Sequence, residues 1–167
     1  KTGTCFQRCI GFDAMNATYI TTYKIDKKYG TNYHERLKEF MKYVQETDIM
    51  VAGSMTDPKG DRGKKPSQQA DPDLFVHIVE RREDGIVVRG AKAHQTGMAN
   101  SHEMLILPTT NLGPDDKDYA VAAAIPVDAP GVIHFFGRQT NENRRMEGDI
   151  DTGNAEYAIV GGETLTV

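Results

Sequence analysis

The chain has 167 residues, of which 38% are hydrophobic and 26% charged, and its formal net charge is −4. This composition is typical of one folded domain, or of a helical piece joined to a β-rich one, and it excludes a disordered chain. The small negative charge without a long basic run argues against a nucleic-acid partner. No apolar run approaches the roughly 20 residues of a membrane-spanning helix, and no signal-peptide pattern opens the chain. Both ends of the sequence start or stop abruptly, so we expect a fragment of a longer polypeptide.

The first predicted element is a helix over residues 4–29, with Gly30 as its stop. Cys5 and Cys9 stand one helical turn apart, at a Cβ separation of about 5–6 Å that is too long for a disulfide. Two thiolates so placed can reach one metal centre but cannot complete a site with four ligands. The alternative is two small buried residues, and the absence of a disulfide favours a reduced, cytosolic location. The expected core stripe of this helix contains Cys5, Cys9, Phe12, Asn16, Tyr19 and Tyr23, widened by Met15 and Ile20.

A capping-box pattern predicts a second helix, which starts after Asn32 with Glu35 in its first turn and ends near Thr47. Lys38, Lys42 and Glu46 are expected to face solvent. The expected core face consists of Tyr33, Leu37, Phe40, Met41 and Val44.

A short strand is expected over residues 49–52, before an unusually long connection over residues 56–72. Most connections have about 4–6 residues, so this one is either a functional loop or a mobile one. Its basic side chains and glycines are suited to an anionic ligand, whereas the alternative is a solvated surface excursion. The residues concerned are Lys59, Gly60, Arg62, Gly63, Lys64 and Lys65.

The rest of the chain is predicted to be rich in short strands. A hairpin over residues 74–82 and 86–92 is joined by an Asp-Gly turn, and further strands are expected over residues 104–107, 119–125 and 132–136 and around Leu165. Several short strands at this spacing favour an antiparallel sandwich or barrel. The expected fold class is therefore α+β, with a helical segment over residues 1–48 and a β-rich domain over residues 49–167.

One stretch, residues 85–103, begins as a β-branched strand and ends in a polar cluster that includes His94, Gln95 and Thr96. Short hydrogen-bonding side chains beside glycines suit a strand that carries groups to a ligand. Gly90 and Gly97 are expected to let a flat ligand approach the backbone. The alternative is an ordinary hairpin strand that runs into a polar loop.

Taken together, several motifs resemble the 4-hydroxybutyryl-CoA dehydratase family, also called vinylacetyl-CoA Δ-isomerases: CFQRC, GTNYH, MTDPKGDRG, DPDLF, EDGIVVRGAKAHQTG and NSHE. The resemblance covers the whole chain and includes the wider flavoprotein group of 4-hydroxyphenylacetate 3-monooxygenase, with an acyl-CoA-dehydrogenase-like fold. It implies the end of an N-terminal helical domain and an antiparallel β-barrel or sandwich middle domain, without the family's C-terminal helical bundle. It also implies a cytoplasmic homotetramer that acts on a CoA thioester.

The same resemblance implies two cofactors, FAD and a [4Fe–4S] cluster. Cys5 and Cys9 would be two cluster ligands, and the remaining ligands would lie outside this chain. The Thr96 hydroxyl is expected to hydrogen-bond flavin N5, and Gln7 to hydrogen-bond the substrate or its leaving group, unless Gln7 is an ordinary surface residue. The implied FAD contacts are Met55, Thr56, Asp57, Pro58, Lys59, Gly60, Asp61, Arg62, His94, Gln95 and Thr96.

Four other polar residues are not assigned to the reaction. We expect His102 and Glu103 to brace the loop after the polar strand and His77 to be a satisfied core residue. Arg138 is expected to form a surface salt bridge rather than to bind a phosphate.

The implied reaction is dehydration of 4-hydroxybutyryl-CoA to crotonyl-CoA, with vinylacetyl-CoA isomerisation as a related activity. The C3 hydrogen is not acidified by the thioester, so general acid–base catalysis worth about 10²–10⁴-fold is too small. In the family an α-proton leaves and one electron passes to FAD, while the cluster binds the hydroxyl as a Lewis acid. Two alternatives remain, a reduced-flavin aromatic monooxygenase without a cluster and a non-catalytic β-domain. The fragment alone is expected to be inactive.

Overall fold

The computed structural model describes residues 6–95, 97–136 and 164–166, with side chains for residues 10–95 and 97–135. These residues form helices and small sheets, as the α+β prediction required, and they fall into two compact units. Unit 1 comprises Lys1–Ser54, Gly97–Leu107 and Ala122–Ala129, and unit 2 comprises Met55–Thr96, Pro108–Val121 and Pro130–Val167. Each unit is therefore assembled from segments that are separated in the sequence.

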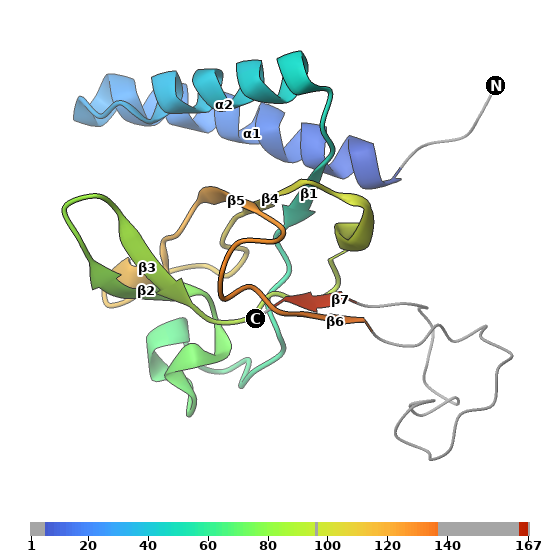
Figure 1. Cartoon of the computed structure of the whole chain (residues 1–167). Coiled ribbons are helices and arrows are strands. Elements are labelled where there is room, and N and C mark those ends of the chain that lie inside the picture. The colour runs from blue at the N-terminus through green and yellow to red at the C-terminus, as the bar shows by residue number, and fades with distance from the viewer. Residues whose placement is uncertain (1–5, 96, 137–163, 167) are drawn as a thin grey trace, which may run out of the picture. The chain divides into compact units, whose positions relative to one another are not determined.

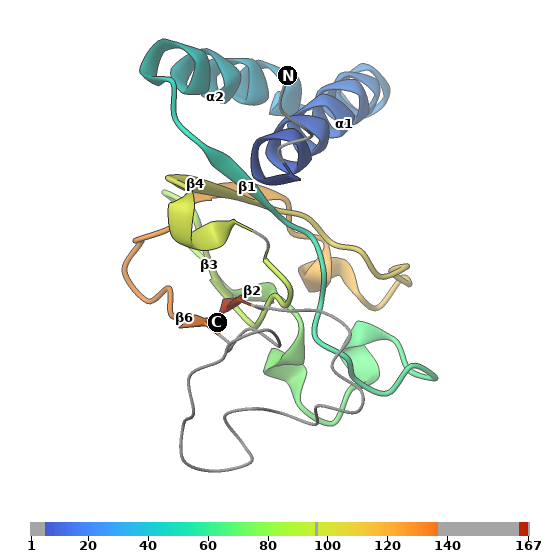
Figure 2. The ribbon, with the colours of Figure 1, turned by 90° about the vertical axis from the view of Figure 1, so that its right-hand side faces the viewer.

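Unit 1 contains two helices and a three-stranded sheet. The helices are α1 (Phe6–Tyr29) and α2 (Tyr33–Thr47), and the strand order is β1 (Val51–Ser54), β4 (Glu103–Ile106) and β5 (Ala123–Pro126). Figures 1 and 2 show α1 and α2 side by side on the same face of this sheet. A short 3-10 turn, η3 (Met98–Asn100), precedes β4.

The turn between the helices is held by the side chain of Asp26. Gly30 ends α1 with a left-handed φ of 68°, and the Asp26 carboxylate then accepts hydrogen bonds from the backbone N–H groups of Tyr33 (2.9 Å) and His34 (2.7 Å). Burial alone would raise the pKa of Asp26, but hydrogen bonds from Thr31, His34 and Tyr33 lower it below its ordinary value. Asn32 makes no side-chain cap, so the capping-box prediction is wrong, whereas the bounds of α2 are confirmed.

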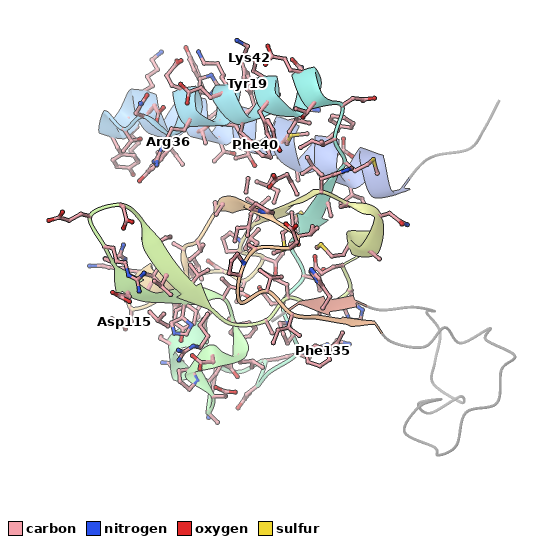
Figure 3. The ribbon with its side chains drawn as sticks, viewed as in Figure 1. Tyr19, Arg36, Phe40, Lys42, Asp115 and Phe135 are labelled. Atoms are coloured by element: carbon pink, nitrogen blue, oxygen red, sulfur yellow. The ribbon has the colours of Figure 1, made fainter. Side chains whose placement is uncertain are left out.

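The core of unit 1 lies between the helices and the sheet. Lys42 on α2 points away from the sheet, whereas Phe40 lies on the opposite side of that helix and packs against the core (Figure 3). The buried members of this core are Ala14, Met15, Val44, Val51 and Leu105, and the partly buried ones are Phe40, Met41, Ile49 and Leu107.

Among the members of the predicted core stripe of α1 whose side chains are described, only Met15 is buried, and Cys5 and Cys9 lie outside those residues. Phe12, Tyr19, Ile20 and Tyr23 are exposed to between 38% and 57%, among the residues whose side chains are described. The buried face instead starts at Gly11, where an added Cβ would lie 1.9 Å from the Val51 carbonyl oxygen. Small residues therefore let α1 approach β1 closely, and the aromatic side chains lie outside this contact.

The sheet of unit 1 corrects the prediction of a purely antiparallel arrangement. β4 and β5 are antiparallel, with Glu103 opposite Pro126, but β1 and β4 are parallel, with Val51 opposite Glu103 and Ser54 opposite Ile106. Two neighbouring parallel strands need a long crossover connection, because the chain must return to the end of the sheet where the first strand began. The segment between β1 and β4 is long enough for this.

Unit 2 contains the predicted hairpin, formed by β2 (His77–Arg81) and β3 (Ile86–Arg89), with a bulge between Ile78 and Glu80. The Arg82 N–H donates to the Gly85 carbonyl (2.9 Å) and closes the Asp-Gly turn. β6 (His134–Phe136) and β7 (Thr164–Thr166) form a second antiparallel pair. Three 3-10 turns complete the unit, η1 (Pro66–Gln68), η2 (Pro72–Leu74) and η4 (Lys117–Tyr119). In the described part of the chain, no helix is long and apolar enough to span a membrane.

Candidate functional site

Within unit 2, the start of the predicted ligand segment 55–62 is hydrogen-bonded to residues in or just before the second predicted ligand segment. The Ala93 N–H donates to the Thr56 carbonyl (2.9 Å), and the Lys92 ammonium donates to the Met55 carbonyl (3.0 Å). The Gln95 amide N–H₂ also points to the Thr56 carbonyl (3.5 Å). These bonds join the start of the first segment to the residues that follow β3 and lead into the second segment.

A buried ion pair lies at the centre of this junction. The Lys92 ammonium pairs with one carboxylate oxygen of Asp57, and the two side chains are only 3% and 10% exposed. The other Asp57 oxygen accepts from the hydroxyls of Thr109 (2.7 Å) and Thr110 (3.3 Å). Burial lowers the pKa of Lys92, although the hydrogen bond and the charge of Asp57 act in the opposite direction.

Sequence reasoning did not identify Lys92 as part of the candidate site. It lies at the end of a predicted strand, where a lysine usually reaches solvent. One signal could have identified it, because the residues around Lys92, VVRGAKA, are mostly apolar or small and are followed by the polar cluster.

Gln95 carries an unusual buried acceptor. Its side chain is 1% exposed, and its amide N–H₂ donates to the Ala93 carbonyl (2.6 Å) as well as toward Thr56. Both of these neighbours are acceptors, so the orientation of the amide is fixed. Its Oε1 atom has no hydrogen-bond partner among the described residues. An unsatisfied buried acceptor costs about 1–3 kcal/mol, and such an atom is therefore suited to a donor from a ligand.

The backbone beside Gln95 is also constrained. His94 has a left-handed φ of 58°, which is uncommon for a residue with a side chain, and Gly97 follows with a φ of 81°. Thr96 lies outside the described residues. An added Cβ at Gly90 would lie 2.4 Å from the Phe75 carbonyl oxygen, so contact with its own chain explains this glycine without a ligand.

The long connection has a defined conformation that its own side chains hold. The Gln69 amide accepts from the Asp61 N–H (2.9 Å) and donates to the Asp61 carbonyl (2.9 Å), and the Asp61 carboxylate accepts from the Gly63 N–H (2.9 Å). An added Cβ at Gly60 would lie 2.4 Å from Gln69 Oε1 and 2.5 Å from Leu74 Cδ2, so a larger residue there would displace these two side chains. The basic side chains Lys59 and Arg62 are exposed on this loop, as are Met55, Thr56 and Asp61, and Pro58 is half-buried.

The other basic residues of the loop have protein partners. The Lys64 ammonium lies 3.7 Å from the Asp61 carboxylate, and the Lys65 ammonium donates to the Asn111 carbonyl (2.7 Å). Of the four basic residues predicted to meet an anionic ligand, Lys59 and Arg62 are therefore better candidates than Lys64 and Lys65.

Of the two predicted metal ligands, Cys9 lies in the first turn of α1, and Cys5 lies outside the described residues. The structure describes the backbone of Gln7 and Cys9 as part of α1. It does not describe the side chains of these two residues. Within the residues that the structure describes, no group of three or more His, Cys, Asp or Glu side chains is arranged to hold a metal ion.

Three residues set aside in the sequence have structural partners. The His77 ring is hydrogen-bonded to the Phe75 carbonyl (3.1 Å) and stacks on Tyr119, so its satisfied state is confirmed. His102 accepts from the Met50 N–H (3.1 Å), which ties the start of β4 to β1. Burial raises the pKa of Glu103, although a hydrogen bond from Tyr43 opposes this effect. Arg138 lies outside the described residues.

A protein-family model described as "4-hydroxyphenylacetate 3-hydroxylase N terminal" matches residues 1–167. The chain belongs to this family. The chain is 60% identical over 169 residues to 4-hydroxybutyryl-CoA dehydratase/vinylacetyl-CoA-Delta-isomerase of Clostridium aminobutyricum. That match covers 100% of this chain and 34% of the relative.

Solved structures show the same relationship for this family member. An oxygen-tolerant archaeal 4-hydroxybutyryl-CoA dehydratase from N. maritimus superposes with a TM-score of 0.84 at 54% identity, over 99% of this chain and 33% of that one. The oxygenase component of 4-hydroxyphenylacetate 3-monooxygenase, complexed with FAD, superposes with a TM-score of 0.63 at 25% identity, over 93% and 31%. The chain thus spans about a third of the length of these relatives.

Proposed function

We propose that this chain is the FAD-facing portion of a longer enzyme that dehydrates 4-hydroxybutyryl-CoA to crotonyl-CoA and isomerises vinylacetyl-CoA. The observation that carries the proposal is the 60% identity, along the whole chain, to an enzyme named for these two activities. In this proposal the enzyme is a cytoplasmic homotetramer, its substrate is a CoA thioester, and the small sheets of the chain are part of a barrel-like middle domain.

The described residues fit FAD. The unpartnered Gln95 Oε1 is an acceptor for a ring N–H group, and the exposed Lys59 and Arg62 suit the anionic pyrophosphate. Residues 55–62 and 94–96 are the proposed contacts, with the Thr96 hydroxyl at flavin N5. When bound, FAD supplies an acceptor and donor for a single electron.

The donor set at the start of α1 fits an iron–sulfur cluster in its chemistry. Cys9 lies near the N-terminus of α1, and a helix N-terminus favours the thiolate form that binds iron. Cys5 and Cys9 would hold the cluster together with ligands from outside this chain. When bound, the cluster supplies a Lewis acid for the substrate hydroxyl.

This chain's own side chains would then orient the substrate rather than exchange its protons. The Gln7 amide is proposed to donate to the substrate or to the departing hydroxide. His102 and Glu103 are not proposed as an acid–base pair, because His102 is bonded to the Met50 N–H and Glu103 to Tyr43.

The decisive experiment replaces each cysteine of the full-length protein with serine. We expect Cys5→Ser and Cys9→Ser to lose iron, acid-labile sulfide and dehydration together, while FAD is retained, because serine is a poor iron ligand. Ala17→Ser, an exposed position on α1, is the matched control and should change nothing. Iron and sulfide contents that equal those of the wild type in both cysteine variants would refute the cluster.

A second candidate is a reduced-flavin monooxygenase that hydroxylates a phenol without a cluster. The FAD-complexed neighbour with a TM-score of 0.63 favours it. Oxygen-dependent hydroxylation of a phenol by iron-free protein would establish this alternative, and its absence together with cluster-dependent dehydration would exclude it.

A further inference from the structure

Three consecutive residues at the start of the predicted FAD segment are bonded to Lys92 and Ala93, which follow β3 and precede the second FAD segment. The Lys92 ammonium donates to the Met55 carbonyl and pairs with the Asp57 carboxylate. The Ala93 N–H donates to the carbonyl of Thr56, the residue between them. Of these bonds, those of Lys92 are the only charged ones, and charge-assisted hydrogen bonds are about twice as strong as neutral ones.

The ion pair is buried on both sides. The two side chains are only 3% and 10% exposed, so water cannot replace the ion-pair partner of either one. Loss of one partner of such a pair leaves an uncompensated buried charge, whereas loss of both is often tolerated. The Asp57 carboxylate also accepts from Thr109 and Thr110, so it already has partners on both oxygens. A carboxylate is moreover poorly suited to an anionic cofactor.

We propose that Lys92 is a positioning residue of the cofactor site, which acts through Asp57 and the Met55 carbonyl to hold residues 55–57 beside His94 and Gln95. The Asp57 carboxylate belongs to the same device, so the proposed FAD contact of Asp57 would be made by its backbone. This inference rests on the proposed FAD site and adds to it the residues that fix its two walls.

The test uses three variants of the full-length protein: Lys92→Met, Asp57→Asn and the double variant. FAD affinity is measured by equilibrium dialysis, the environment of the bound flavin by visible circular dichroism, and folding by the melting temperature without FAD. Both single variants should melt earlier than the wild type. Because small displacements of positioned groups cost up to about 100-fold, both should bind FAD roughly tenfold to 100-fold more weakly.

The double variant separates positioning from stability. It carries no bare buried charge, so its melting temperature should return toward that of the wild type. A methionine at position 92 cannot donate to the Met55 carbonyl, so FAD affinity and the circular dichroism signal should stay reduced. Recovery of both along with the melting temperature would mean that the pair serves stability alone and would overturn the inference.

Arg81→Met is the matched control, because it breaks an ion pair in the same unit, between Arg81 and Asp118 (2.6 Å), whose side chains are 61% and 58% exposed. It should leave FAD affinity unchanged. If Lys92→Met does not fold, Asp57→Asn and the double variant still decide the result. Wild-type protein that binds no FAD would overturn the proposed function and this inference together. Variants that bind FAD as tightly as a FAD-binding wild type would overturn the inference alone.

Discussion

Asp57 and Glu103 are both buried carboxylates, but their partners differ. Asp57 faces the Lys92 ammonium, which compensates its charge. Burial raises the pKa of Glu103, a hydrogen bond from Tyr43 lowers it in part, and the nearby Asp128 raises it further. The folded protein therefore holds the Glu103 proton at a higher pH than the unfolded chain does, and the ionised form of Glu103 destabilises the fold.

This difference predicts a pH-dependent effect of Glu103→Gln. Between the ordinary value of about 4.3 and the raised pKa, the folded state binds more protons, so this contribution to stability falls as the pH rises. At about pH 7 the variant should be at least as stable as the wild type, and at about pH 5, nearer the ordinary glutamate pKa, the wild type should gain stability relative to the variant. Urea unfolding of both proteins at the two pH values measures this. An equal difference at both pH values would contradict the prediction.

At the residue scale, the sequence alone predicted the segments of the site but not how they are joined. Thr56 and Gln95 belonged to predicted segments, and the structure brings these two together. Lys92 was missed because the partner that buries it, Asp57, lies far away in the sequence, and pairing across that distance depends on the path of the intervening chain.

The contact between α1 and β1 depends on a missing side chain. At Gly11, an added Cβ would lie 1.9 Å from the Val51 carbonyl oxygen and 2.8 Å from its carbon, both of which are backbone atoms that cannot rotate away. The close approach places Ala14 and Met15 in the core and leaves the larger aromatic residues of α1 outside it.

Gly11→Ala therefore tests packing against helix propensity. Alanine favours a helix over glycine by about 1 kcal/mol, but overpacking at this contact should outweigh that gain and destabilise the protein by about 1–3 kcal/mol. Gly85→Ala is the control, because nothing lies within 4 Å of an added Cβ there. Chemical denaturation of the two variants gives the comparison, and a Gly11→Ala protein that is more stable than the wild type would disprove the close contact.

Elements were predicted well where the signal was local. The Asp-Gly turn located the β2–β3 hairpin, and the apolar periodicity located α2. The helix cap and the direction of β1 relative to β4 were predicted wrongly. Asp26 caps α2 from the preceding helix, and a strand's direction depends on how the whole segment between β1 and β4 returns, neither of which is visible in a short window.

At the scale of the whole molecule, the chain spans about a third of its relatives' length and provides only two of the proposed cluster ligands. We therefore expect the 167-residue chain alone not to convert 4-hydroxybutyryl-CoA, because two thiolates leave an iron–sulfur cluster without its full set of ligands. An assay of crotonyl-CoA formation, with the full-length protein as the positive control, checks this. Turnover by the isolated chain would contradict it and would place the reacting groups within these residues.

The strands β1 and β4 tether both ends of the segment that lies between them. β1 ends at Ser54 and β4 begins at Glu103, and the two strands are hydrogen-bonded neighbours in one sheet. The conformational entropy lost when the ends of a loop are brought together grows only with the logarithm of its length. This entropy is lost when the sheet forms during folding. A ligand that later contacts both segments of the site therefore does not have to offset that loss with its own binding energy.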